Sequence, residues 1–402
     1  MKKPFILGVN YWPRRKAMYW WSDFDEVEVQ EDFSLIHDLS MKMIRIFLLW
    51  EDFQPTPDKI SSASLNHLVK VCDIAAKLDL KLNITFFTGN MSGPNWSPSW
   101  LLDGAPIPGA RQLIRSGEVI ERGYLNPFVN TMVLDAERLL IRTIVGTLKD
   151  HPAISMWDLG NEPDNFARPP SPIAGQNWVR EMTTLIHDLD PIHQVTCGLH
   201  IDSLLKNNNL RIDQVFAETD ISVMHAYPMY LDWSRSPLDP EIVPFTCALV
   251  AALCNKPVLM EEFGGCTAPP GKLSFDWKWN VNGKQYNQFM VNEEEFAVYI
   301  AAVLPRLVEV GATGALLWCF ADYIPELWNK PPCFENRHER YFGLIRPDGS
   351  LKPHAQVIKD FAATCPEINT TPKRLVLPYT ADDFYKDPLQ STTSLYLQWL
   401  DQ

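Results

Sequence analysis

Short apolar runs rich in β-branched residues alternate along the chain with longer amphipathic stretches. The apolar runs cover residues 5–10, 43–49, 81–87, 154–160, 194–199, 221–226, 257–262 and 314–320. Stretches with the 3.6-residue period of a helix lie between or after them, at residues 27–39, 65–78, 128–149, 248–253, 293–310 and 353–363. Strands that alternate with helices indicate βα units around a parallel sheet.

Eight βα units close naturally into a barrel, so the pattern predicts an α/β fold of the (β/α)8 TIM-barrel class over residues 1–365. A doubly wound sheet is the alternative, but no Gly-x-Gly-x-x-Gly turn follows the first run. Long connections follow three runs, at about 88–126, 263–291 and 321–350, and such loops build the active-site face of a barrel. Residues 366–402 are expected to pack on the barrel as an extension rather than form a separate domain.

Charge and composition exclude several classes of protein. The chain has 36 Lys and Arg against 49 Asp and Glu, a net charge of −13, which argues against a nucleic-acid-binding face. No apolar stretch reaches the roughly 18 residues of a membrane span. The first apolar run is too short for a signal peptide, and the eight cysteines show no Cys-x-x-Cys spacing, so we expect a cytoplasmic protein with reduced thiols. The extension could also contribute to a homo-oligomer contact.

Two glutamates follow apolar strands in a way that suggests a reaction centre. Glu162 stands in Asn161-Glu162-Pro163 after the fourth run, and Glu262 ends the seventh. A single acid at a strand end is often only a solvated loop residue, but two on one rim suit a retaining glycosidase, whose carboxyl groups stand about 5–5.5 Å apart. Strand alternation is expected to turn Glu261 and Glu262 to opposite faces, so that only one points into the barrel.

These motifs, taken together, resemble glycoside hydrolase family 5 and its retaining (β/α)8 clan. The resemblance covers about residues 5–363 and rests on the two glutamate motifs with His225-Ala226-Tyr227 at the sixth strand, Arg45 at the second and Trp318 at the eighth. It implies that Glu162 is the acid/base and that Glu262, not Glu261, is the nucleophile.

Neighbouring residues have matching expected roles. Arg45 would hold Glu262 ionised, because a nearby guanidinium lowers a carboxylate pKa. Asn161 can hydrogen-bond the sugar 2-hydroxyl, an interaction that strengthens in the transition state. Tyr227 can donate to Glu262, His225 can tune Glu162, and Trp318 offers an apolar face to the sugar ring.

A weaker resemblance points to the β-mannosidase branch of this family. It rests on the aromatic segment 8–21, which includes Trp12, and on Trp50 after the second run. Such aromatics would crowd one side of the cleft, and a blocked cleft favours exo action. Many family members carry a His at the end of the third strand, where this chain has Phe or Thr; Asn90 and Trp96 are candidate replacements in substrate binding.

The sequence therefore predicts a retaining β-glycoside hydrolase that acts by double displacement. The expected activity is that of an exo-β-mannosidase on short β-linked oligosaccharides, either manno-oligosaccharides or mannosyl-N-acetylglucosamine. An endo-acting mannanase or glucanase, a transglycosylase and a non-catalytic carbohydrate-binding barrel remain as alternatives. No cofactor or metal is expected, since Cys333 and His338 have no further ligands close to them in sequence. Glu262 should set the acid limb of a bell-shaped pH profile and Glu162 the basic limb, with a raised pKa.

Overall fold

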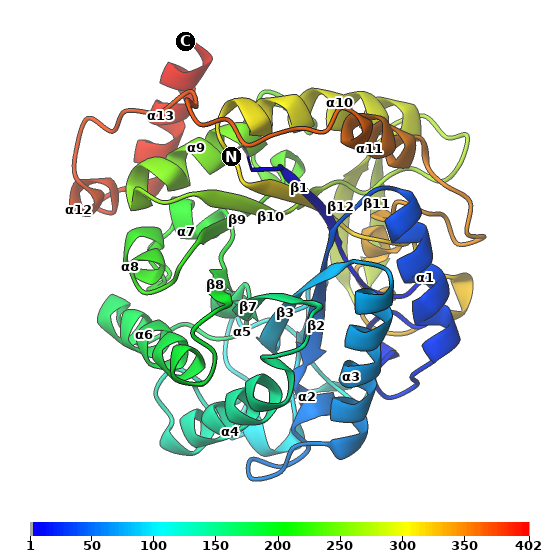
Figure 1. Ribbon diagram of the computed structural model, residues 1–402, viewed down its shortest axis with the longest axis vertical. Helices are drawn as coiled ribbons and strands as arrows, with labels where there is room; N and C mark the ends of the chain where they lie inside the picture. Colours follow the sequence, from blue (N-terminus) through cyan, green and yellow to red (C-terminus); the bar gives the residue numbers. More distant parts are fainter. Residues whose placement is uncertain (1–2, 402) are drawn as a thin grey trace.

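The computed structural model describes residues 3–401, and within them eight parallel strands form one sheet that curves into a barrel (Figure 1). The strands in sheet order are β8 (Gln194–Gly198), β7 (Ile154–Asn161), β3 (Lys81–Thr88), β2 (Met43–Leu49), β1 (Ile6–Asn10), β13 (Gly314–Trp318), β10 (Val258–Gly264) and β9 (Ser222–Ala226). The two end strands meet where the Ile201 amide donates to the His225 carbonyl at 3.0 Å. The eight predicted strands and the predicted fold class are confirmed.

Helices surround the sheet on its outer side (Figure 1). The longer ones are α1 (Glu26–Asp38), α3 (Ser62–Lys77), α4 (Thr131–Leu148), α6 (Pro172–Leu189), α9 (Ile242–Cys254), α10 (Glu293–Glu309) and α11 (Pro353–Ala363). Short helices α2 (Trp50–Phe53), α5 (Pro163–Phe166), α7 (Asp202–Leu205) and α8 (Ile212–Ala217) lie between strands and longer helices. Helix α9 begins six residues before the predicted start because residues 242–250 are buried on every side and show no amphipathic period.

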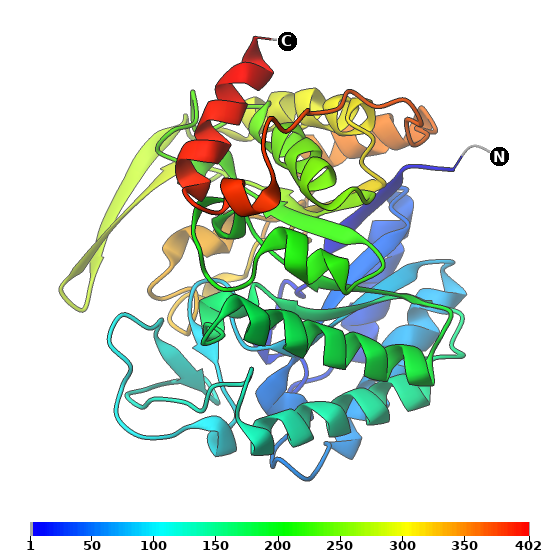
Figure 2. The ribbon, with the colours of Figure 1, turned by 90° about the vertical axis from the view of Figure 1, so that its left-hand side faces the viewer.

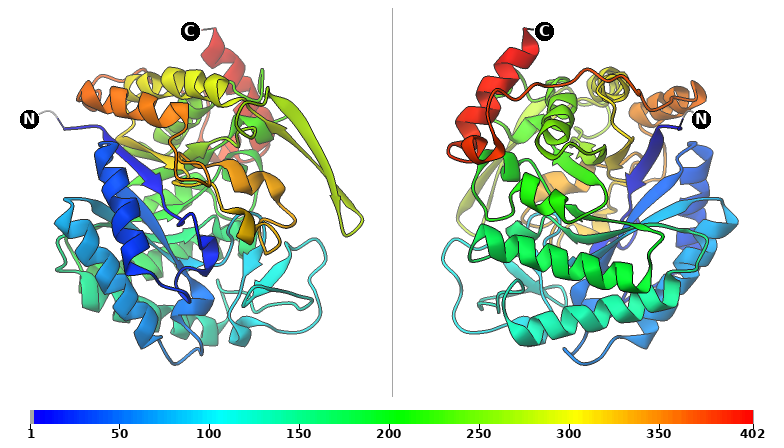
Figure 3. Two further views of the ribbon diagram at one scale, coloured as in Figure 1. Left: turned by 90° about the vertical axis from the view of Figure 1, so that its right-hand side faces the viewer. Right: turned by 60° about the vertical axis from the view of Figure 1, so that its left-hand side comes forward.

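Two of the three long connections contain strands that the sequence did not predict. The first carries β4 (Asn95–Trp96), β5 (Leu113–Arg115) and β6 (Glu118–Ile120), and the second carries the antiparallel hairpin of β11 (Phe275–Val281) and β12 (Lys284–Met290). The hairpin projects well beyond the barrel (Figures 2 and 3). All three long connections gather at one end of the barrel in these views, which is the face predicted to hold the site.

The C-terminal residues lie against the outside of the barrel. Helices α12 (Ala381–Phe384) and α13 (Pro388–Leu400) follow an irregular segment, and α13 contacts α7 and α9. The rings of Tyr396 and Trp399 pack on Phe245 of α9, and the Tyr385 hydroxyl donates to the Ser203 carbonyl at 2.9 Å.

No helix within residues 3–401 combines the length and the apolar character needed to cross a membrane. The eight cysteines, all of which lie in the described part of the chain, are unpaired.

Candidate active site

A cavity of about 370 Å³ opens at the C-terminal ends of the strands. Strand-end residues form its floor, and the loops after β3, β7, β8, β9 and β13 form its walls. The lining residues are Asn90–Gly93, Arg111, Asn161, Glu162, Asn165, His200–Asp202, His225, Tyr227, Tyr230, Leu231, Glu262, Trp318, Asn336, His338, Glu339 and Phe342. The volume lies at the lower end of the range of about 300–1,000 Å³ that is usual for small-molecule sites.

Glu162 enters this cavity from the residue that follows β7. Its backbone is left-handed, with φ of 46°, a conformation that costs a non-glycine residue about 1–3 kcal/mol and is concentrated at functional sites. One carboxylate oxygen lies 3.1 Å from Nδ1 of His225, and the other accepts a hydrogen bond of 2.7 Å from Nδ2 of Asn165. The turn before Pro163 thus aims the carboxylate into the cavity and two side chains hold it there.

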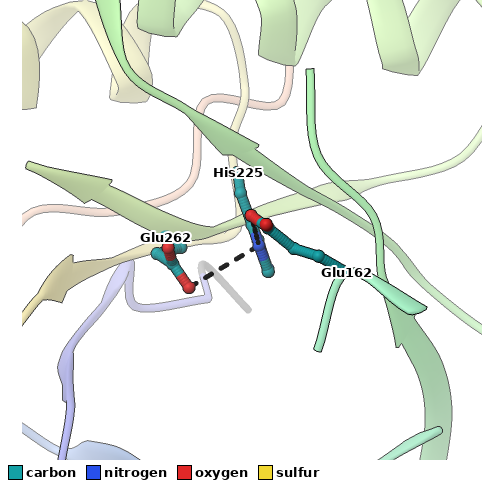
Figure 4. Close-up of side chains that lie close together, drawn as sticks. All are labelled: Glu162, His225 and Glu262. Atoms are coloured by element: carbon teal, nitrogen blue, oxygen red, sulfur yellow. Dashed lines mark hydrogen bonds and ion pairs between the residues drawn. The ribbon is translucent and has the colours of Figure 1, made fainter. Parts of the chain in front are cut away.

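Glu262 faces Glu162 from β10. Its Oε1 accepts a hydrogen bond of 2.5 Å from the Tyr227 hydroxyl, and its Oε2 lies 3.3 Å from Nη1 of Arg45. Single ligand atoms of Glu162, His225 and Glu262 all lie within 4.8 Å of one another (Figure 4). The structure therefore brings together the two carboxylates that the sequence singled out, with one imidazole between them.

The expectation for Glu261 is wrong, because strand alternation breaks down at this point. The pairing register of β10 with β9 shifts between Met260 and Glu262, which marks a β-bulge. As a result Glu261 is also buried inside the barrel, where its carboxylate accepts a hydrogen bond of 2.6 Å from Asn83 and lies 3.1 Å from Nε2 of His225. Glu261 thus forms the layer beneath Glu262.

Arg45 is the cation of this interior layer. Its guanidinium is fully buried and lies 2.7 Å from Asp158, 3.6 Å from Glu261 and 3.3 Å from Glu262. The predicted contact with Glu262 is present, but Arg45 forms ion pairs with three carboxylates rather than with one.

We expect Arg45→Met to lower the free energy of unfolding by about 3–5 kcal/mol, because removing one partner leaves buried carboxylates uncompensated. Urea unfolding followed by far-ultraviolet circular dichroism measures the change. Arg15→Met is the matched control, since Arg15 forms only an exposed pair with Glu31, and it should change stability little. Equal stability of the two variants would contradict the role of Arg45 as the cation that compensates the buried carboxylates.

The pKa directions of the two glutamates are opposite to those expected from the sequence. Burial raises the pKa of Glu162, but the His200 charge and the bond and charge of His225 outweigh it, so that pKa lies below its ordinary value. Burial raises the pKa of Glu262, and the Glu162 charge adds to the rise, while His225, Arg45 and Tyr227 offset only part of it.

Burial lowers the pKa of His225, but the Glu262 charge and the hydrogen bonds to Glu162 and Glu261 raise it to about 9. At neutral pH, His225 therefore holds a proton within 3.1 Å of Glu162.

A second histidine, which the sequence analysis did not single out, also faces Glu162. Nδ1 of His200 lies 3.7 Å from Glu162, while its Nε2 lies 3.0 and 3.1 Å from the two oxygens of Asp164. Asn208 donates to the same Asp164 at 2.8 Å. Burial lowers the pKa of His200, but the charges of Asp164 and Glu162 raise it to about 10.

This shift predicts how stability depends on pH. Because folding raises the pKa of His200, its stabilising contribution should be complete below an unfolded value of about 6.5 and lost as pH rises through about 10. Urea unfolding of the wild type and His200→Gln should thus show a stability difference that is largest near pH 6 and shrinks toward pH 10. A stability difference that grows with pH would contradict a raised pKa of His200 in the folded protein.

Three predicted substrate contacts are corrected by the structure. Trp12, Trp50 and Trp96 are buried beneath the loops and do not line the cavity. Trp12 stacks on Phe47 at 5.2 Å, Trp50 donates to Gln54 at 2.8 Å, and Trp96 donates to the Met91 carbonyl at 3.3 Å. They support the walls because the loops fold over them.

Asn161 and Trp318 do line the cavity, as predicted, and Asn90 lies in its wall. The Asn90 side chain donates to Asn95 at 2.9 Å, and the Asn90 carbonyl accepts from Nδ2 of Asn161 at 3.1 Å. Asn90 therefore orients Asn161, whose Oδ1 has no hydrogen-bond partner within residues 3–401.

Glu162, His225 and Glu262 also have the composition of a small metal site. Both ring nitrogens of His225 already face carboxylates at 3.1 Å, an arrangement suited to exchanging a proton. That the reaction needs no metal or cofactor stays a prediction from the sequence.

Known proteins match this chain in part of its length. Residues 138–320 match a family model described as GH family 5 beta-mannosidase-like. A probable mannan endo-1,4-beta-mannosidase C of Aspergillus terreus is 29% identical over 35% of this chain and 39% of its own length. A putative mannan endo-1,4-beta-mannosidase 9 of Oryza sativa is 31% identical over 42% of each chain. The chain thus spans about two-fifths of the length of these curated relatives.

Solved structures share the fold over most of the chain. A GH5_18 variant from Streptomyces cattleya in complex with Manb1-4GlcNAc superposes with a TM-score of 0.79 at 19% identity, over 99% of this chain and 92% of that one. The exo-beta-1,4-mannosidase Op5Man5 from Opitutaceae bacterium strain TAV5 gives 0.74 at 24% identity, over 91% and 60%. These likenesses show the barrel fold. The matching family model covers residues 138–320, so over this part of its sequence the chain is similar to glycoside hydrolase family 5.

Proposed function

We propose that the chain hydrolyses short β-mannosides from their non-reducing end with retention of configuration. The observation that carries the proposal is the pair Glu162 and Glu262, which converge within 4.8 Å in a small cavity. Inverting glycosidases separate their carboxyl groups by about 6.5–9.5 Å to admit a water molecule, whereas retaining ones keep them at about 5–5.5 Å. The observed spacing fits direct attack by one carboxylate.

In the first step an oxygen of Glu262 attacks C1 of the sugar while the bond from C1 to the leaving oxygen breaks. Glu162 gives its proton to that oxygen, so the leaving sugar departs as a neutral alcohol. In the second step water attacks C1, the bond from C1 to Glu262 breaks, and Glu162 takes the proton from the water. Tyr227, at 2.5 Å from Glu262, stabilises the departing carboxylate.

The cluster must place its proton on Glu162 and leave Glu262 ionised before the first step. His225 can deliver that proton, because its Nδ1 lies 3.1 Å from Glu162 and 3.6 Å from Glu262. The proton then belongs to the coupled group rather than to one residue. With the pKa of His225 at about 9, we expect the basic limb of the pH profile to report this shared proton.

Exo action is supported by a bridge between two loops. Nδ2 of Asn336, after β13, donates to the Ser92 carbonyl, after β3, at 3.2 Å. Next to it, a Cβ on Gly93 would come within 2.5 Å of Asn336, so the loops are in close contact. In the sheet β2 and β1 lie between β3 and β13, so the bridge spans the C-terminal ends of β1 and β2 and would block a groove there. An endo enzyme would need an open groove, and the aromatics that could line one, Trp96, Trp277 and Trp279, are not among the cavity-lining residues.

The choice of mannose is supported by the family model and by the names of the similar proteins. The GH5_18 structure in complex with Manb1-4GlcNAc suggests mannosyl-N-acetylglucosamine as the first disaccharide to try. Orientation of the sugar would use Asn161, whose unpartnered Oδ1 suits the 2-hydroxyl that distinguishes mannose from glucose.

Initial rates on aryl β-mannoside, β-glucoside, β-galactoside and β-N-acetylglucosaminide test the sugar, with Glu262→Gln beside the wild type. Product sizes from mannohexaose, sampled from the earliest times, test exo action. We expect a preference for the mannoside that the substitution abolishes, and mannose as the early small product. Early release of mannobiose and mannotriose would favour the endo mannanase.

We also propose a cytoplasmic location, which the unpaired cysteines support. A homo-oligomer, and the absence of nucleic-acid partners, stay predictions from the sequence.

A further inference from the structure

Glu339 is a buried acid in the wall of the cavity. Neither step of the proposed reaction uses its carboxyl group. It belongs to the short helix at Arg337–Tyr341 in the connection after β13, and its side chain lines the cavity. The surrounding backbone is held firmly: Arg340 donates to the Cys333 carbonyl at 2.7 Å, and the Tyr341 carbonyl accepts from Lys352 and from the Thr267 amide, each at 3.0 Å. Glu339 is therefore a fixed part of the wall.

The surroundings of Glu339 favour an uncharged carboxyl group. Within residues 3–401 Glu339 forms no ion pair with Lys or Arg. Its carboxylate lies 3.5 Å from Nε2 of His338, but burial lowers the pKa of His338 to about 4. Burial and the nearby charges of Glu262 and Glu162 raise the pKa of Glu339 to about 8, although Ser92 and Trp318 act to lower it. An uncharged carboxyl group can both donate and accept a hydrogen bond.

The position of Glu339 relative to the reaction centre suggests what it contacts. Glu162 is held by Asn165 and faces His200, after β7 and β8, which marks the side of the leaving group. Glu339 lies near Trp318 and Ser92, after β13 and β3, beside the bridge of Asn336 to Ser92. A sugar with C1 at Glu262 and its ring on Trp318 would turn its far edge toward this wall. C4 is the ring position opposite C1.

We propose that Glu339 is a specificity-determining residue whose carboxyl group hydrogen-bonds the free C4 hydroxyl of the terminal sugar. The inference rests on the proposed function and deepens it. In a β-1,4-linked chain, the C4 oxygen of every internal sugar carries another sugar and has no proton to donate. A wall residue that requires this hydroxyl therefore selects chain ends, together with the bridge that closes the same side.

A substrate and variant cycle tests the contact. Aryl β-mannoside and its 4-deoxy analogue are compared in the wild type, Glu339→Ala and Glu339→Gln, with Glu326→Gln as control because Glu326 is exposed in the same connection. The wild type should discriminate against the 4-deoxy substrate by about 10–100-fold in kcat/KM. In Glu339→Ala the kcat/KM values of the two substrates should differ by less than about threefold, because the residue that binds the C4 hydroxyl has been removed.

Glu339→Gln keeps a donor and an acceptor, so it should retain most of the discrimination and remain measurable if the alanine variant folds poorly. Wild-type discrimination should rise above pH 8 as Glu339 loses its proton, because a carboxylate accepts a hydrogen bond from the C4 hydroxyl more strongly than a neutral carboxyl does, whereas that of Glu339→Gln should not change with pH. If Glu339→Ala discriminated against the 4-deoxy substrate as strongly as the wild type, the contact would be excluded. The same would follow if the discrimination of Glu339→Gln changed with pH as that of the wild type does. Either result would overturn this inference and leave the proposed function standing. If the wild type turned over no β-mannoside, the proposed function would fall and this inference with it.

Discussion

Glu262→Gln is expected to lower kcat/KM on aryl β-mannosides by at least about 10⁴-fold, or about 5 kcal/mol of transition-state stabilisation. The amide keeps the shape of the side chain and its bond to Tyr227, but it is a far weaker nucleophile, so the glycosyl-enzyme does not form. Initial rates with purified protein measure the loss. Glu294→Gln, which changes an exposed acid at the start of α10, should leave the rate unchanged.

Chemical rescue distinguishes a nucleophile from a residue that only supports the site. In Glu262→Ala, azide can occupy the space that the carboxylate leaves and attack C1 from the same face. With a good leaving group it should restore turnover and give the α-glycosyl azide. A Glu262→Ala variant that keeps wild-type activity, or yields only β-azide, would remove Glu262 from the nucleophile's role.

Glu162→Ala is expected to have an effect that depends on the leaving group. A general acid contributes about 10²–10⁴-fold, and it matters most when the departing oxygen is strongly basic. The loss in kcat/KM should therefore approach the upper figure for a disaccharide and become small for 2,4-dinitrophenyl β-mannoside, which needs no protonation.

Rates across a series of aryl leaving groups measure this dependence for the wild type and Glu162→Ala. Glu181→Ala is a suitable control, since Glu181 lies on α6 and pairs with Arg138 on the outer side of the barrel. If Glu162→Ala slowed all substrates by one common factor, Glu162 would act as a binding or structural residue rather than as the proton donor.

The barrel could be predicted because its strands are buried on both faces and read as continuous apolar runs, while most helices carry a clear amphipathic period. Helix α9 lacked that period because it is buried on every side. The hairpin of β11 and β12 could not be recognised from apolar runs, because exposed polar residues alternate with the apolar ones along both of its strands.

The site was predictable as far as it lies on strand ends. Glu162, Glu262, Arg45, His225 and Tyr227 meet because the barrel brings the carboxyl ends of its strands to one rim. The bulge at Glu261 has no signature in a pattern that assumes strict alternation. Glu339, Ser92 and Asn336 come from irregular loops whose course depends on contacts between distant segments. The expected pKa direction of Glu162 was wrong because it depends on His200, which comes from such a loop, as well as on His225. That of Glu262 was wrong because burial and the Glu162 charge outweigh Arg45.

The most direct test of the central claim is proton nuclear magnetic resonance of the first product formed from mannosyl-β-1,4-N-acetylglucosamine. We expect β-mannose to appear first, beside free N-acetylglucosamine, and α-mannose to grow only at the rate of spontaneous mutarotation. Initial appearance of α-mannose would mean inversion and would contradict direct attack by Glu262. Absence of cleavage of this disaccharide and of aryl β-mannosides would contradict the β-mannosidase assignment itself.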